Sequence, residues 1–182
     1  MNAAAGAVTD ELSRRLLRVK LFLVDVDGVM TDGRIVYGNY GDELKFFDVQ
    51  DGFGMVLLRR AGLKTVIVSG KKSRVNPRRV KELGVDKLYQ NAFDKLKILE
   101  QILKKFKVKA DEVCYIGDDL IDLPVLKRVG FSAAPANAVD EVKKAVHHCT
   151  EKPGGRGAAR ELAEMILKAQ GRWAAVTERY FR

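Results

Sequence analysis

The chain has 182 residues, of which 47% are hydrophobic and 31% charged, and its formal net charge is +9. This composition is typical of a soluble globular protein with one sizeable core, and it excludes a disordered or fibrous chain. No apolar run approaches the roughly 18 residues that a membrane span needs. The start of the chain lacks the basic end and apolar block of a secretory signal. We expect one cytoplasmic domain over residues 1–182, with an N-terminal extension over 1–19 and a C-terminal tail over 172–182.

The positive charge alone does not predict a nucleic-acid partner. Basic residues are spread over segments such as KKSRVNPRRVKEL and KLKILEQILKKFKVK, where they alternate with apolar residues at helical spacing. Cys114 and Cys149 lie far apart and form no metal-ligand pattern, and no basic run is interleaved with aromatic residues for base stacking. We expect neither nucleic-acid nor membrane binding, because a positive field also suits a small anionic substrate.

Strand-like and helix-like segments alternate along the chain. The apolar run 21–24 predicts a buried strand, and residues 34–38 and 43–49 predict a hairpin around the turn sequence GNYGD. Further strands are predicted within KTVIVSG, VDKLYQ, EVCYIGDD and FSAAPANA, with VHHC as an edge strand. Helices are predicted over 52–62, 73–83, 94–106, 120–130, 138–146 and 157–171.

This order of elements predicts an α/β fold. Strands that alternate with helices form a parallel sheet with right-handed crossovers, so we expect a doubly wound, mainly parallel, Rossmann-like sheet with helices on both faces. No insert is large enough for a second domain, so the fold is expected to be capless, with a protruding β-hairpin after the first strand.

Polar residues follow three of the predicted strands. Asp25 and Asp27 end the first strand, Ser69 and Gly70 end the second buried strand, and Asp118 with its neighbour Asp119 follows VCYI. Aspartate and glycine after a strand often mark only a turn. However, ligands bind beyond the carboxyl ends of parallel strands, where these clusters would meet in one crevice.

The acidic residues of this crevice suit phosphate chemistry. Closely spaced carboxylates raise each other's pKa unless a cation lies between them, and their oxygen atoms suit Mg²⁺. One carboxylate can attack a phosphoryl group to form an aspartyl-phosphate, while a second acts as general acid and base. Such a site also needs a lysine, a hydroxyl or backbone N–H groups to neutralise the transferring group.

Four motifs in this order, DVDGVMTDG, VSG, DKL and GDDLIDLPV, resemble those of the haloacid dehalogenase superfamily of phosphohydrolases. By that resemblance Asp25 is the nucleophile and Asp27 the general acid/base, and Asp118 completes a Mg²⁺ site with the Asp25 carboxylate and the Asp27 backbone carbonyl. The residues expected to bind the phosphoryl group are Ser69, Gly70 and Lys95. Asp122 is expected to be a supporting carboxylate, as is Asp119, although Asp119 could equally be a helix N-terminal acid.

Residues 20 to 175 more closely resemble the 3-deoxy-D-manno-octulosonate 8-phosphate phosphatases, in segments such as TDGRIVYGNYGDELKFFDVQDGFG, YIGDDLIDLPVLKRVG and GGRGAARELAEMILKAQGRW. This resemblance implies release of inorganic phosphate in the pathway to lipopolysaccharide. It also implies a homotetramer in which the hairpin packs between subunits, and a substrate-side loop GGRG whose Arg156 suits a phosphate or a sugar carboxylate.

Two departures leave the substrate open. Lys71 stands where these enzymes usually carry arginine, and lysine lacks the planar bidentate fork. Pro77 lies where a helix would usually be running, so that helix is expected to start late. The alternatives are a nonulosonate 9-phosphate phosphatase of the same superfamily and a non-catalytic assembly module with the same fold. The intact Asp25 argues against the second.

Overall fold

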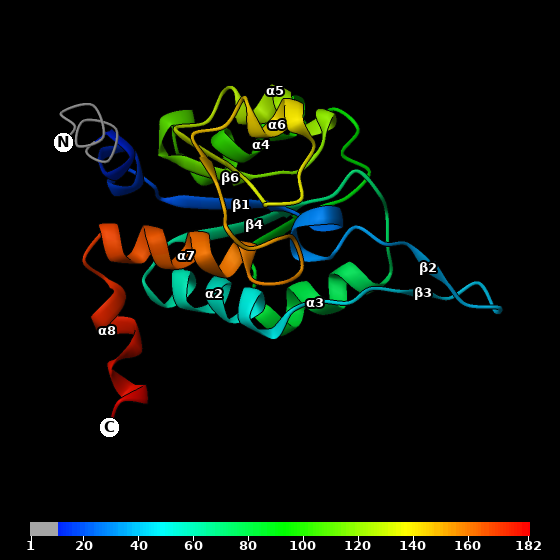
Figure 1. The fold of residues 1–182 in the computed structure, drawn as a ribbon, viewed down its shortest axis with the longest axis horizontal. Coiled ribbons are helices and arrows are strands. Elements are labelled where there is room, and N and C mark those ends of the chain that lie inside the picture. Colours follow the sequence, from blue (N-terminus) through cyan, green and yellow to red (C-terminus); the bar gives the residue numbers. More distant parts are fainter. Residues whose placement is uncertain (1–10) are drawn as a thin grey trace.

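The computed structural model describes residues 11–182 and contains one six-stranded parallel sheet with helices on both faces (Figure 1). The sheet has the order β5-β4-β1-β6-β7-β8. This arrangement confirms the predicted doubly wound α/β sheet. The strands are β1 (Leu21–Asp25), β4 (Lys64–Val68), β5 (Lys87–Tyr89), β6 (Val113–Ile116), β7 (Phe131–Ala134) and β8 (His148–Cys149).

Strand β1 lies inside the sheet between β4 and β6. Leu23 is aligned with Val66 on one side and with Tyr115 on the other, and all five residues of β1 are buried. A strand that is covered on both faces reads as a continuous apolar run, which explains the sequence LFLV. The central position of β1 fixes its last residue, Asp25, between the ends of two other strands.

Helices cover the two faces of the sheet with separate cores (Figure 1). On one face, Met55 and Leu58 of α2 and Ile166 of α7 pack against Phe22 and Val24. On the other face, Leu99 and Ile102 of α4 pack with strand residues such as Leu23 and Tyr115. The helices are α2 (Val49–Arg60), α3 (Val75–Leu83), α4 (Lys95–Phe106), α5 (Leu123–Leu126), α6 (Asp140–Lys143), α7 (Ala158–Ala169) and α8 (Trp173–Thr177). Within residues 11–182, none of the helices combines the length and the apolar character that a bilayer crossing requires.

The hairpin after the first strand is a separate two-stranded antiparallel sheet, β2 (Val36–Tyr37) and β3 (Glu43–Leu44). Its strands are shorter than the sequence predicts, because the chain from Lys45 onward leaves the ladder and enters α2 early. The carboxylate of Asp48 caps α2 by accepting hydrogen bonds from the backbone N–H groups of Gln50 and Asp51, so this helix begins at Val49 rather than at residue 52.

Two other predicted helices are shorter than expected. The segment predicted as 120–130 contains a 3-10 turn, Leu120–Asp122, followed by the single turn α5, and the segment predicted as 138–146 contains only α6. Helix α3 begins at Val75, so Pro77 lies in its first turn, where a missing N–H group costs no intrahelical hydrogen bond. Gly84 ends α3 in the left-handed conformation, as predicted.

The chain segments at both ends pack on the same body. Residues 11–17 are helical, and Leu16 joins the core beside α7; the predicted extension before residue 11 lies outside the described residues. At the other end, Trp173 and Val176 of α8 pack against the core, and the ring of Tyr180 lies edge-on to Phe53 at 5.6 Å between centroids. Phe181 beyond it remains 82% exposed.

Candidate active site

A pocket of about 280 Å³ lies at the carboxyl ends of the central strands. The loops after β1, β4 and β6 form it, and the first residue of α4 closes one side. Most of the residues predicted for the site therefore come together here. The lining residues are Asp25, Asp27, Ile35, Gly70, Lys71, Phe93, Lys95, Asp118, Asp119 and Ile121.

The loop after β1 is built as one wide turn, in which the N–H of Thr31 donates to the Val26 carbonyl at 3.0 Å. Gly28 within it has φ +96, a left-handed conformation that glycine adopts without strain. A side chain at Gly28 would also overlap the carboxylate of Asp118. The sequence DVDG thus combines the acids Asp25 and Asp27 with Gly28, whose lack of a side chain lets Asp118 approach.

The nucleophile candidate Asp25 is held by a buried ion-pair network. The Lys95 ammonium lies 2.7 Å from Asp25 Oδ1 and 2.5 Å from Asp122 Oδ1, and its distance to the Tyr115 hydroxyl is 3.3 Å. Lys95 is the first residue of α4, whose start is fixed by the cap Asp94. The cap places the Lys95 ammonium between two carboxylates, where it is buried rather than solvated.

Asp122 is buried and fixes its neighbours in the site through hydrogen bonds to both of its carboxylate oxygens. Its Oδ1 accepts from Lys95 and from the Tyr115 hydroxyl, and its Oδ2 accepts from the N–H groups of Asp118 and Asp119 at 2.9 and 3.3 Å. These bonds fix the loop after β6. Asp119 is exposed at the pocket, and its carboxylate caps the following turn by accepting a hydrogen bond from the N–H of Leu120 at 2.7 Å, as a helix N-terminal acid does.

Three carboxylates form a cluster that suits a divalent cation. One oxygen atom from each of Asp25, Asp118 and Asp122 lies within 4.8 Å of the others. Asp122 already has partners on both oxygens, which leaves Asp25 and Asp118 as the better carboxylate ligands. Hard oxygen donors of this kind fit Mg²⁺, and the predicted third donor is the backbone carbonyl of Asp27. The side chain of Asp27 is not part of the cluster.

The electrostatics of the cluster also favour a cation. Burial raises the pKa of Asp25 to about 7, although Lys95 acts in the opposite direction and Asp122 adds to the rise. Burial and the charge of Asp122 likewise raise the pKa of Asp118 to about 7. A metal ion would compensate both negative charges, because it supplies the positive charge that Lys95 alone cannot provide.

The carboxylate of Asp27 contacts Lys45, a residue that sequence reasoning missed. The Lys45 side chain is almost fully buried and its ammonium also lies 3.4 Å from Glu43. Lys45 follows the hairpin strand β3, so the hairpin reaches the candidate acid/base directly. The only sequence signal is a lysine between apolar residues in ELKFF, which reads equally well as a solvated strand residue. Tyr115 was missed for another reason: in VCYI it reads as core.

Three further predicted residues have different outcomes. Ser69 is buried, does not line the pocket, and donates its hydroxyl to the Lys71 carbonyl at 2.9 Å. Gly70 lines the pocket. Arg156 lies in a neighbouring hollow of about 320 Å³, together with Asp32, Arg34, Phe46, Phe47, Asp48 and Gly155.

The GGRG loop packs on the loop that carries the two acids. The N–H of Gly155 donates to the Val29 carbonyl at 2.8 Å, and a side chain at Gly154 would overlap the Gly28 carbonyl. Asp51 ties the end of this loop, since its carboxylate accepts from the N–H of Gly157 at 3.1 Å and of Arg160 at 2.9 Å. These glycines therefore allow close backbone contact beside Asp27.

Comparisons with known proteins agree with this geometry. Residues 82–162 match the family model of haloacid dehalogenase-like hydrolases. The 3-deoxy-D-manno-octulosonate 8-phosphate phosphatase KdsC of Yersinia pestis is 40% identical over 172 residues, covering 94% of this chain and 92% of that protein. KdsC of Escherichia coli strain K12 is 38% identical, covering 92% and 89%.

A solved structure gives the same picture in three dimensions. The 3-deoxy-D-manno-octulosonate 8-phosphate phosphatase of Moraxella catarrhalis, in complex with magnesium, phosphate and KDO, superimposes with a TM-score of 0.92. It is 38% identical and the match covers 94% of this chain and 98% of that one. The parallel sheet and its acidic pocket are those of a haloacid dehalogenase-like hydrolase. Within that class, the identity over nearly the whole length shows that the chain belongs to the 3-deoxy-D-manno-octulosonate 8-phosphate phosphatase family.

Proposed function

We propose that this chain is a cytoplasmic, Mg²⁺-dependent phosphatase that hydrolyses 3-deoxy-D-manno-octulosonate 8-phosphate to the sugar acid and inorganic phosphate, for lipopolysaccharide synthesis. The observation that carries this proposal is the position of Asp25, which ends the central strand beside Lys95 and Asp118 in an open pocket. The relatives from Yersinia pestis and Moraxella catarrhalis are named as phosphatases of this substrate.

The proposed reaction has two steps. In the first, an oxygen of the Asp25 carboxylate attacks phosphorus, the bond from phosphorus to the sugar oxygen breaks, and Asp27 gives its proton to that leaving oxygen. In the second, Asp27 takes a proton from water, the water oxygen attacks the aspartyl-phosphate, and inorganic phosphate leaves Asp25 as a carboxylate. Both acids are thereby returned to their starting state.

The remaining residues neutralise and orient the phosphoryl group. Lys95 contributes a buried positive charge beside Asp25, and Gly70, whose N–H is the proposed donor, lines the pocket. Ser69 would have to turn its hydroxyl from the Lys71 carbonyl to reach the phosphoryl group. Mg²⁺, when bound by Asp25, Asp118 and the Asp27 carbonyl, supplies charge compensation for the transferring group. Arg156 is proposed to bind the sugar part of the substrate.

The hairpin supports a homo-oligomer, for which a tetramer is the proposed size. Strands β2 and β3 project from the body (Figure 1), and five large apolar side chains on or near them are exposed: Ile35, Tyr37, Tyr40, Leu44 and Phe46. An exposed apolar surface of this kind marks an interaction site. Light scattering should give four times the chain mass, and Tyr40→Ser with Leu44→Ser should lower it. A monomer at micromolar concentration would refute the assembly.

The test of the activity is phosphate release from a panel of sugar phosphates, with and without Mg²⁺. The panel contains 3-deoxy-D-manno-octulosonate 8-phosphate and a nonulosonate 9-phosphate, with Asp25→Asn as the control. Mg²⁺-dependent turnover of the eight-carbon substrate, lost in the control, supports the proposal. Preference for the nine-carbon substrate would keep the mechanism and change the pathway, and Lys71 would be the first residue to examine. No release from either would favour a non-catalytic module.

A further inference from the structure

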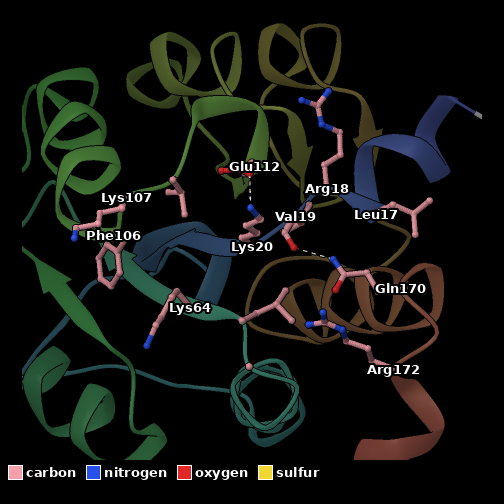
Figure 2. Close-up of a pocket in the computed structure, with 13 residues that line it drawn as sticks. Leu17, Arg18, Val19, Lys20, Lys64, Phe106, Lys107, Glu112, Gln170 and Arg172 are labelled. Atoms are coloured by element: carbon pink, nitrogen blue, oxygen red, sulfur yellow. Dashed lines mark hydrogen bonds and ion pairs between the residues drawn. The ribbon is translucent and has the colours of Figure 1, made fainter.

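Another hollow, of about 660 Å³ (Figure 2), is larger than the two already described and lies where β1 and β4 begin, at the opposite ends of these strands from the acid cluster. It forms where β1 and β4 begin, where α4 ends and where α7 leads into the tail. We call it the amino-edge cavity and define it by six of its lining residues: Arg18, Lys20, Lys64, Lys107, Glu112 and Arg172. Its size is within the range of roughly 300 to 1,000 Å³ that is usual for small-molecule sites.

The lining of the amino-edge cavity is strongly basic, with Glu112 as its single acid. Three of its cations have acidic partners, which are listed here: Lys20 with Glu112 at 2.6 Å, Lys64 with Asp86 at 2.8 Å, and Arg18 with Asp111. Lys107 has no acidic partner among residues 11–182, and Arg172 donates only to the neutral carbonyl of Ala61 at 2.9 Å. Two exposed cations of the lining, Lys107 and Arg172, are therefore without an acidic partner among residues 11–182.

Hydrogen bonds of Gln170 hold one wall of the cavity. The Gln170 amide group donates to the carbonyls of Leu16 and Val19, at 3.0 and 2.8 Å, and so joins the end of α7 to the segment before β1. Its Oε1 is buried without a hydrogen-bond partner among the described residues, and because it is an acceptor, a hydroxyl group of a ligand or a water could satisfy it but an ionised phosphate oxygen could not. Leu63 and Phe106 add apolar surface to the lining.

Lys64 and Lys107 lie on one side of the cavity and Arg172 lies on the other, with Lys20 between them (Figure 2). The ammonium groups of Lys64 and Lys107 point away from the centre of the cavity in Figure 2, but both side chains are exposed, and their flexible stems allow them to turn toward an anion held from the other side by Arg172. Ammonium and guanidinium groups form charge-assisted hydrogen bonds with phosphate oxygens, and the apolar lining suits an organic group attached to the phosphate. We propose that the amino-edge cavity binds a small phosphorylated molecule with several negative charges, separately from the substrate pocket.

The elements that form the amino-edge cavity also carry the active-site residues at their other ends. Strand β1 runs from the residue after Lys20 to Asp25, and β4 runs from Lys64 to the residue before Ser69. Helix α4 runs from Lys95 to the residue before Lys107. The two sites are thus separated by the length of these elements, and a ligand in the cavity leaves the substrate pocket open.

The experiment is isothermal titration of the full chain with tripolyphosphate in metal-free buffer. The test variant carries Lys107→Asn and Arg172→Gln, which remove the two uncompensated charges; asparagine also tolerates the left-handed conformation of residue 107. The matched control is Lys127→Gln, which removes an exposed lysine that does not line the cavity. Mg²⁺-dependent phosphatase activity of each variant, measured in parallel, reports that the chain is folded.

Binding should be about tenfold weaker in the double variant, because two charge-assisted contacts are lost, and should be unchanged in Lys127→Gln. Phosphatase activity should be the same in all three proteins. Equal affinity in all three proteins, or no measurable binding to the unaltered chain, would overturn the proposal. Equal loss in both variants would assign the binding to net charge and would also overturn it.

Discussion

The Lys95 ammonium and the Asp25 carboxylate lie 2.7 Å apart in the buried centre of the site, although 70 positions separate them in the chain. Strand β1 and helix α4 also share the core that contains Leu23 and Leu99, and Lys95 pairs in addition with Asp122 of the loop after β6. The pair matters for both stability and catalysis, because each residue is buried and the two together offset much of the cost of desolvating their charges.

Replacement of Lys95 by methionine should therefore destabilise the chain and abolish turnover. Asp25 and Asp122 would be left buried without their cation, and breaking such a pair costs about 3 to 5 kcal/mol. Urea unfolding at pH 8 measures the loss. The control is Lys97→Met on the exposed side of the same helix. If both variants unfold at the same urea concentration, the network contributes nothing to the free energy of unfolding.

Asp118 and Asp119 should differ sharply although they are neighbours. Asp118→Asn removes a carboxylate of the acid cluster, so the Mg²⁺ concentration needed for half-maximal phosphate release should rise at least about tenfold. Asp119→Asn keeps a side chain that can cap the following turn, and its Mg²⁺ requirement should stay within about twofold. If Asp119→Asn raised the Mg²⁺ requirement and Asp118→Asn did not, Asp119 would be the metal ligand.

The metal-free protein should lose stability as the pH rises from about 4 to about 7. The pKa of Asp25 and that of Asp118 are raised to about 7, whereas an unfolded aspartate has a pKa of about 3.9. Between these values the folded state binds more protons than the unfolded state, so the free energy of unfolding falls with pH and levels off above 7.

Mg²⁺ should remove much of this decline, because it binds the deprotonated carboxylates of the folded state. Urea unfolding from pH 4.5 to pH 8, with and without Mg²⁺, checks both statements. The variant with Asp25→Asn and Asp118→Asn should show neither the decline nor the response to Mg²⁺. A metal-free protein that becomes more stable across this interval would contradict the raised pKa values.

Lys45 should act on the proton-transfer step through Asp27. Its buried ammonium contacts that carboxylate, so Lys45→Met should leave Asp27 poorly oriented and lower kcat by about 10- to 100-fold on an alkyl phosphate. An aryl phosphate with an acidic leaving group needs little protonation and should lose far less. Lys45→Arg should recover part of the activity, and Lys72→Met, at an exposed position, is the control. An equal loss on both substrates would exclude this role.

Much of the fold and the core of the site could be predicted from the sequence, because local patterns encode them. The apolar run before Asp25 specifies a buried strand, and Asp94 marks the helix start that presents Lys95. The rule that ligands bind at carboxyl ends of strands then brings Asp118 beside Asp25.

The parts that could not be predicted depend on long-range contacts. Nothing local indicates that Lys45 turns inward to Asp27, or that the hydroxyl of Tyr115, within an apolar strand, supports Asp122. The direction of the Ser69 hydroxyl is set by the Lys71 carbonyl, and the separate hollow around Arg156 depends on how the GGRG loop crosses the first loop. Each is a property of two segments together.

The central position of β1 has a consequence for how the chain folds. This strand precedes both of its partners, β4 and β6, in the chain, so Leu21 cannot pair with Val113 until β6 has been made. Contacts of such long sequence separation slow folding. Meanwhile the sequence LFLV stays without a partner, and unpaired apolar strands associate between chains. We expect nascent chains to need protection by chaperones until β6 has emerged, and refolding chains until β6 has paired with β1.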